Sequence, residues 1–456
     1  MDPFFGKLSR RSFVMLPVLA PLGALARERS EEHWFHYDHI IGTSMDLAVW
    51  LPATFDSAEI ARQAVRAALG EINRLSLILS TYDPDSEICR LERKPKTRHQ
   101  SHQGNQGMSR EPTHVFELYR FWQRRSGGVL SMRPAGEHGP IDVNALGKAY
   151  IIDRTAAFLK VRTPNLEGLV LNIGGDIVVW GRACELGVID PSAAHDNAEP
   201  LTRIVLENEA VATSGVYARG AHLIDARTGR LARSPASATV IAPDAVTANA
   251  LATTLCIVGD REGLDLVGRV PRAEAMRIEQ AGTIARTTGF ARRERVIEVR
   301  QSMPSNWPAG FEVTISLTLT TPDPRLDRSY VAFWVEDLAG KLVRAIVLWG
   351  NKAQYHPEMT TFWKITRGDK DLLYKLTRAT RAPGSYRVLW NGLDDDGKPV
   401  PRGTYRIMIE TNRYRGDYAK ASGTIACESE PTTITLAGSV NYDTIKVQYG
   451  PRPSQV

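Results

Sequence analysis

The sequence predicts an α+β domain followed by an all-β domain. Within residues 33–290, a strand-like run at 46–51 stands beside two stretches with helical periodicity, at 57–79 and 115–125. Beyond Pro304 the pattern changes to short runs in which apolar and polar residues alternate, as is typical of β strands. The mixed periods of the first part and the single period of two in the second part predict two separate domains.

The all-β domain is expected over residues 305–430, with residues 431–456 as a C-terminal tail. Phe311–Leu319 alternates, and two further runs within Tyr386–Glu410 flank the turn-rich segment Asn391–Pro399. Three adjacent Asp residues in that segment do not alternate as they do in a Ca2+-binding EF-hand loop. The expected structure is therefore a hairpin turn between the two runs.

The composition argues against several classes of partner and site. The 456 residues include 57 Lys and Arg against 51 Asp and Glu, a formal net charge of +6 at pH 7. These charges are dispersed, and no basic run is interleaved with aromatic residues, so a nucleic-acid partner is not expected. The four Cys residues lack the spacing of a zinc or redox site. They fit disulfides in an oxidising compartment and isolated buried thiols equally well.

Residues 1–26 are typical of an export signal. Lys7, Arg10 and Arg11 form a basic start, residues 14–25 form an apolar core, and the end of the segment resembles a cleavage site. The Arg-Arg pair indicates the twin-arginine route, and the apolar core is too short to cross a bilayer. We therefore expect export to the periplasm. Because no other apolar run is long enough to span a membrane, no membrane span is expected after signal removal.

Six short motifs follow one another along the first domain. They are Gly42–Met45, Leu79–Glu87, Asp142–Tyr150, Asn172–Asp176, His222–Gly229 and Asn249–Thr253. Together these motifs resemble the ApbE-like family of FAD:protein FMN transferases over about residues 35–290. The resemblance implies a Mg2+-dependent transfer of FMN from FAD to a Thr or Ser hydroxyl of an acceptor flavoprotein, with release of AMP. It also implies that the acceptor belongs to an exported or membrane-bound electron-transfer system.

The residue types in these motifs suit a flavin dinucleotide. A site for FAD needs apolar or aromatic surface for the ring, and cations for the pyrophosphate. Met45 and Tyr82 offer such surface, although each fits core packing as well. Lys148 follows a glycine among apolar residues, so its ammonium group must reach solvent or pair with an anion. Phosphate and the Asp142 carboxylate are both candidates for that anion.

The resemblance also assigns roles to particular residues. It implies that Met45 and Tyr82 contact the flavin, that Asp142 contacts the nucleotide with Lys148 nearby, and that the backbone of Leu223 meets the nucleotide. His222 is the candidate general base, because deprotonation of a hydroxyl benefits from a nearby group of suitable pKa. An isolated His is more often a structural residue, and that alternative stays open.

Two departures from the family pattern concern the metal and the nucleotide. The resemblance implies Mg2+ ligands at the Ala145 backbone, at Thr253 and at residue 249, where the family usually has Asp and this chain has Asn249. An amide oxygen ligates more weakly than a carboxylate, so Mg2+ is expected to bind appreciably only together with FAD. Asn249 would alternatively cap a helix that begins at Ala250. Val129-Leu130-Ser131 stands where the family commonly has Phe-Asp at the nucleotide.

The second domain resembles a predicted periplasmic module with an immunoglobulin-like sandwich, through Trp390–Gly392 and Gly403–Tyr405. This resemblance indicates architecture and location, and carries no reaction chemistry. Two alternatives to FMN transfer remain open from the sequence. One is an FAD pyrophosphatase that uses water as the nucleophile and gives FMN and AMP. The other is a non-catalytic exported flavin-binding protein, which the Asn at position 249 and the Ser at position 131 favour.

Overall fold

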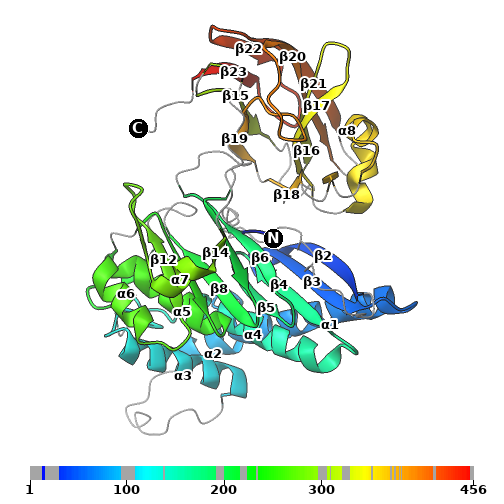
Figure 1. Cartoon of the computed structure of the whole chain (residues 1–456). Coiled ribbons are helices and arrows are strands. Elements are labelled where there is room, and N and C mark those ends of the chain that lie inside the picture. The colour runs from blue at the N-terminus through cyan, green and yellow to red at the C-terminus, as the bar shows by residue number, and fades with distance from the viewer. Residues whose placement is uncertain are drawn as a thin grey trace. The chain divides into compact units, whose positions relative to one another are not determined.

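The computed structural model contains two compact units, one with the elements up to Arg295 and the other with the elements beyond it (Figure 1). Each unit has its own β-sheets and its own apolar clusters. The structure describes residues 13–15, 30–93, 108–136, 139–191, 200–215, 223–232, 235–295, 306–308, 310–320, 329–350, 353–369, 372–373, 376–378, 380–381, 383–413 and 417–451. Residues 94–107 and most of the predicted export signal lie outside these ranges.

An eight-stranded antiparallel sheet forms the centre of the first unit, in the order β13-β12-β11-β8-β5-β4-β3-β2. A second sheet has the order β1-β6-β7-β14. The strands of the larger sheet are β2 (Ser30–Ile40), β3 (Thr43–Pro52), β4 (Gly168–Ile173), β5 (Asp176–Trp180), β8 (Glu209–Ser214), β11 (Ser237–Ala242), β12 (Glu274–Ile278) and β13 (Ile284–Arg286). Those of the smaller sheet are β1 (Phe13–Met15), β6 (Cys184–Val188), β7 (Thr202–Leu206) and β14 (Glu294–Arg295).

Strand β3 shows why the larger sheet lies in the middle of three layers. Its residues alternate between two apolar clusters, because successive side chains of a strand point to opposite faces. Leu47 and Val49 pack with the helices, whereas Ala48 and Trp50 pack with residues of β6 and β7. Both faces of the strand are therefore buried, which explains its nearly continuous apolar sequence.

Helices α1 to α6 of the first unit pack on one face of the larger sheet, whereas Phe290 of α7 packs in the cluster on the other face. Helix α4 contacts α1 and α5, and α5 also contacts β8 and β11. Helix α5 is buried around almost its whole circumference, as its Ala- and Leu-rich sequence predicts. The helices are α1 (Ser57–Leu79), α2 (Glu87–Arg93), α3 (Arg110–Arg125), α4 (Asn144–Arg162), α5 (Ala245–Ile257), α6 (Asp260–Gly268) and α7 (Thr288–Arg293). None of the helices in the described ranges is long and apolar enough to cross a membrane.

The second unit consists mainly of two β-sheets that share one apolar cluster. One sheet has the order β19-β15-β23-β22, and the other has the order β18-β17-β16-β20-β21. The short helices η1 (Ala353–Glu358) and α8 (Thr360–Ile365) accompany the second sheet, and Phe362 of α8 packs against its outer face. The strands are β15 (Phe311–Leu319), β16 (Tyr330–Glu336), β17 (Leu342–Trp349), β18 (Thr377–Arg378), β19 (Gly384–Trp390), β20 (Gly403–Asn412), β21 (Tyr418–Cys427), β22 (Thr432–Leu436) and β23 (Ile445–Pro451).

The turn after Trp390 is fixed by an aromatic contact. The Trp307 ring lies edge-on to the Trp390 ring, with 4.9 Å between their centroids. Gly392 has φ +75°, and a Cβ atom there would lie 2.9 Å from the Trp307 ring. Glycine is required at this position because both the backbone conformation and the close ring exclude a side chain.

Two sequence predictions about the second domain are wrong. The runs on either side of Asn391–Pro399 do not form a hairpin, because β19 pairs with β15 and β20 pairs with β16 and β21 in the other sheet. The predicted C-terminal tail, residues 431–456, supplies β22 and β23. Their apolar positions, such as Val447, are buried in the shared cluster, so the domain extends well beyond residue 430.

Candidate functional site

Three of the six motifs meet at one buried carboxylate. Asp176, the first residue of β5, places its Oδ2 2.7 Å from the Lys148 ammonium group of α4. The same oxygen accepts a hydrogen bond of 3.0 Å from the Asn249 amide of α5. The Asp176 side chain is 3% exposed and that of Lys148 is 22% exposed, so the cation lies on the solvent side of the pair.

Asn249 is not a helix cap. Helix α5 begins at Ala245, and Asp244 caps it by accepting a hydrogen bond from the Thr247 backbone. Asn249 therefore lies inside the helix, one turn before Thr253, and the capping interpretation of the sequence is wrong. Its Oδ1 atom is buried and has no hydrogen-bond partner, although buried polar atoms are nearly always paired. The Asn249 Oδ1 atom is therefore an acceptor that no protein donor uses in the described part of the chain.

A chain of buried hydrogen bonds holds the turn that carries Asp176. The Gly175 backbone donates to Asn172 Oδ1, and Asn172 Nδ2 donates to Asp46 Oδ2 at 2.9 Å. Asp46 in turn contacts the His36 ring, so the chain crosses β4, β3 and β2. At Gly174, φ is +60° and a Cβ atom would lie 2.8 Å from the Thr43 side chain, so only glycine fits here.

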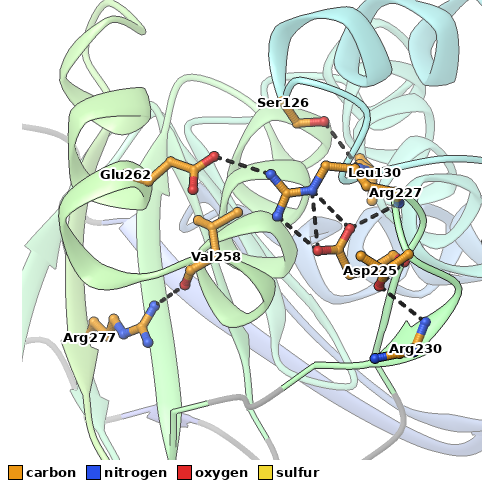
Figure 2. A network of polar contacts seen from close by, with 9 residues as sticks. Ser126, Leu130, Asp225, Arg227, Arg230, Val258, Glu262 and Arg277 are labelled. Atoms are coloured by element: carbon orange, nitrogen blue, oxygen red, sulfur yellow. Dashed lines mark hydrogen bonds and ion pairs between the residues drawn. The ribbon is translucent and has the colours of Figure 1, made fainter.

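Helix α5 is held at both ends by charged side chains. At its start, the Asp153 carboxylate of α4 accepts hydrogen bonds from the Ala245 and Val246 backbones, at 2.8 and 3.0 Å. At its end, Arg277 donates to the Val258 carbonyl at 2.6 Å (Figure 2). An anion at the N-terminus and a cation at the C-terminus also suit the helix dipole. These contacts fix the helix that carries Asn249.

Asp153, which contacts the start of α5, has a clearly raised pKa. Burial and, secondly, the neighbouring Asp244 carboxylate raise the pKa of Asp153 to about 7, while the two backbone donors and Lys160 oppose this shift. The carboxyl group that joins α4 to α5 therefore titrates near neutral pH.

Other predicted residues gather at the start of α4. The Asn144 amide donates to the Tyr82 hydroxyl at 3.1 Å, and the Asn144 backbone donates to Asp142 at 2.9 Å. Tyr82 is 73% exposed, so its ring is available for stacking, in contrast to a core residue. Ala145, the second residue of α4, is partly buried and lies one turn before Lys148.

The segment 223–231 packs on the turn that follows α3. It contains the short strands β9 (Ile224–Asp225) and β10 (Arg230–Leu231). The Ala226 backbone donates to the Val129 carbonyl at 3.3 Å. Figure 2 shows the Arg227 guanidinium between the Asp225 carboxylate, at 2.8 Å, and Glu262 of α6, at 3.4 Å. Hydrogen bonds from Arg227 hold the pKa of Asp225 below its usual value.

The remaining predicted residues differ in how far their side chains are buried. Met45 is fully buried among the helices, and Val129 and Leu130 are also buried, so their side chains fit core packing. Ser131 and Leu223 are partly buried. The candidate base His222 lies outside the described residues.

Asp176 was missed as a site residue, although it ends the Asn172–Asp176 motif. Its position directly after two glycines was the available signal, because such a turn brings the next side chain close to a site. No group of three or more His, Cys, Asp or Glu side chains able to hold a metal occurs in the described part of the chain. A cation here would therefore rely on a carboxylate together with amide, hydroxyl or carbonyl oxygens.

Comparisons with known proteins agree with this organisation. Residues 126–277 match the ApbE family, and residues 312–444 match a family described as predicted periplasmic protein (DUF2271). The FAD:protein FMN transferase of Haemophilus influenzae is 29% identical over 140 residues, which are 28% of this chain and 40% of that protein. That of Treponema pallidum is 25% identical over 182 residues, which are 35% of this chain and 49% of that protein.

The chain thus spans less than half the length of these relatives. The crystal structure of the ApbE protein from Thermotoga maritima aligns with a TM-score of 0.49 at 21% identity, over 58% of this chain and 100% of that one. Together, the two family matches show that this chain contains an ApbE family domain followed by a DUF2271 predicted periplasmic domain.

Proposed function

We propose that this protein is an FAD:protein FMN transferase, which moves FMN from FAD to a Thr or Ser hydroxyl of an acceptor flavoprotein with the help of Mg2+. The observation that carries the proposal is the Lys148–Asp176–Asn249 cluster, where three motifs meet around a buried carboxylate and an unpaired buried oxygen. The names of the relatives support the same activity.

The residues have distinct tasks in this proposal. Lys148 supplies a partly exposed cation for the FAD pyrophosphate. Tyr82 offers an exposed ring for the flavin. The proposal keeps Met45 as a second flavin contact and Asp142 and Leu223 as nucleotide contacts, as the family resemblance implies. Residues 129–131 form the adjoining turn, which the contact between Ala226 and Val129 joins to segment 223–231.

The residues also fit a divalent cation. Asn249 Oδ1 is a buried acceptor without a donor, Thr253 lies one helical turn later, and Ala145 offers a backbone carbonyl. Oxygen atoms of these kinds are what Mg2+ prefers. When bound, Mg2+ would neutralise charge on the pyrophosphate and favour departure of AMP.

In the reaction, the acceptor hydroxyl oxygen forms a bond to the FMN phosphorus. The bond from this phosphorus to the oxygen of the AMP phosphate breaks, and the hydroxyl proton passes to a base, for which His222 is the candidate. The products are a protein with FMN in phosphodiester linkage, and AMP. We further propose a periplasmic location after twin-arginine export, and an acceptor in an exported or membrane-bound electron-transfer system.

The proposal is tested by incubating the protein with FAD, Mg2+ and candidate acceptor proteins, and by weighing every product. Acceptor that carries FMN, together with AMP, supports it. Free FMN and AMP in equal amounts, without modified acceptor, would identify a pyrophosphatase. Bound but intact FAD would identify a non-catalytic flavin-binding protein. The Lys148→Met variant is the matched control, because it removes the cation and keeps the bulk of the side chain.

A further inference from the structure

We propose that Asp176 is a ligand of the cation site and supplies the carboxylate that position 249 lacks. This inference rests on the proposed function, because it concerns the Mg2+ site of that reaction. The negative charge of the site would then lie on β5, while Asn249 on α5 serves as a neutral ligand.

The first argument is the surroundings of Asp176. Its carboxylate is almost fully buried, and both of its side-chain contacts use the same oxygen, Oδ2. A buried carboxylate needs a compensating cation. Lys148 fills this need in the structure, but its long, flexible side chain is partly exposed and suits a phosphate as well. A divalent cation beside Asp176 would release the ammonium group for the pyrophosphate.

The second argument is the orientation of Asn249. Because Nδ2 donates to the Asp176 carboxylate, the amide is fixed with Oδ1 as its free end. That oxygen is buried without a donor, so its lone pairs remain available to a cation. Asp176 therefore lies next to the proposed ligand and also determines which of its atoms faces the cation.

The third argument is charge. An Asp at position 249 would place two carboxylates about 3 Å apart, which is unfavourable without a bound cation. This chain has one carboxylate and one amide in contact, so a single negative charge is kept. Exchanging the two residues would preserve both the charge and the number of oxygen ligands.

The test compares the wild type with Asp176→Asn, Asn249→Asp and the exchanged double variant, all in the full chain. Mn2+ and Mg2+ affinities are measured by calorimetry with FAD present, and circular dichroism checks folding. We expect Asp176→Asn to weaken metal binding about tenfold or more, Asn249→Asp to strengthen it, and the exchange to restore most of the loss.

Wild-type metal affinity in a folded Asp176→Asn variant would overturn the proposal, and so would an exchanged variant as weak as the single one. If Asp176→Asn does not fold, Lys148→Met replaces it. Removing the competing ammonium group should raise metal affinity in the absence of FAD, and unchanged affinity would refute a shared carboxylate. These titrations need no transferase activity. A protein that binds metal as expected but transfers no FMN would therefore refute only the proposed function.

Discussion

Asp153 should make the stability of the first unit depend on pH in a predictable way. The pKa of Asp153 is raised from 3.8 to about 7 in the folded protein. The folded state therefore holds a proton between these values that the unfolded chain releases, and stability falls as the pH rises toward and through 7. Between pH 5 and pH 8 this linkage costs about 2–3 kcal/mol, since each pH unit between the two pKa values costs about 1.4 kcal/mol.

The Asp153→Asn variant removes this titration. Its amide oxygen can still accept from the start of α5 but satisfies the two backbone donors less well, so we expect a loss of about 1 kcal/mol at pH 5. At pH 8 the variant should be the more stable protein, because the difference in unfolding free energy shifts by about 2–3 kcal/mol in its favour. Groups that do not interact with Asp153 titrate alike in the two proteins, so their effects cancel when the proteins are compared at each pH.

The assay is urea unfolding of both full-length proteins at pH 5 and pH 8. A two-domain chain can unfold in two steps, so hydrogen exchange in residues 245–257 identifies the transition of the first unit. Asp265→Asn, which removes an exposed carboxylate from α6, is the matched control. A difference between the wild type and Asp153→Asn that stays constant within about 0.5 kcal/mol would refute the reasoning.

Four further outcomes are expected. Lys148→Met should weaken FAD binding about tenfold or more in calorimetry, and it should also lower the unfolding temperature, because it leaves the buried Asp176 carboxylate without its cation. Asn172→Ala should destabilise the first unit by about 1–3 kcal/mol in urea unfolding, because it removes two buried hydrogen bonds. A fragment of residues 30–295 should be soluble and bind FAD, since it contains every strand from β2 to β14. Mg2+ should bind the wild type measurably more tightly with FAD than without it, and equal affinities in the two titrations would contradict this expectation.

Hydrophobic periodicity predicted single helices and strands better than it predicted which strands pair. The helix expected at 57–79 is α1, and the strand expected at 46–51 lies within β3. Both patterns are local: α1 shows apolar residues at helical spacing, and the strand shows a short, nearly continuous apolar run. The pairing of β19 and β20 is not local. An alternating run shows that one face of a strand is buried, but it does not show which strand pairs with it. Two strands that follow each other across a turn therefore look like a hairpin in the sequence even when they belong to different sheets.

The site shows the same limit. The sequence pointed to Lys148 and Asn249, but their shared partner Asp176 depends on how β5 meets α4 and α5. The capping interpretation of Asn249 was wrong because a capping residue must precede the first turn of the helix. Helix α5 begins at Ala245, and Asp244 caps it. Cap residues are ambiguous where several polar residues precede an apolar run.

Charge explains why metal and FAD should bind together in this chain. Asp176 and Lys148 form a pair with no net charge, and the Asn249 amide adds none. A dication entering this site alone would meet an ammonium group and only one carboxylate, and it would lose water for little gain. Under the proposed function, the FAD pyrophosphate would bring further negative charge, attract the ammonium group and free the carboxylate for the cation. The amide at position 249 would then make occupancy of the metal site depend on the substrate, whereas a second carboxylate would hold the metal in its absence.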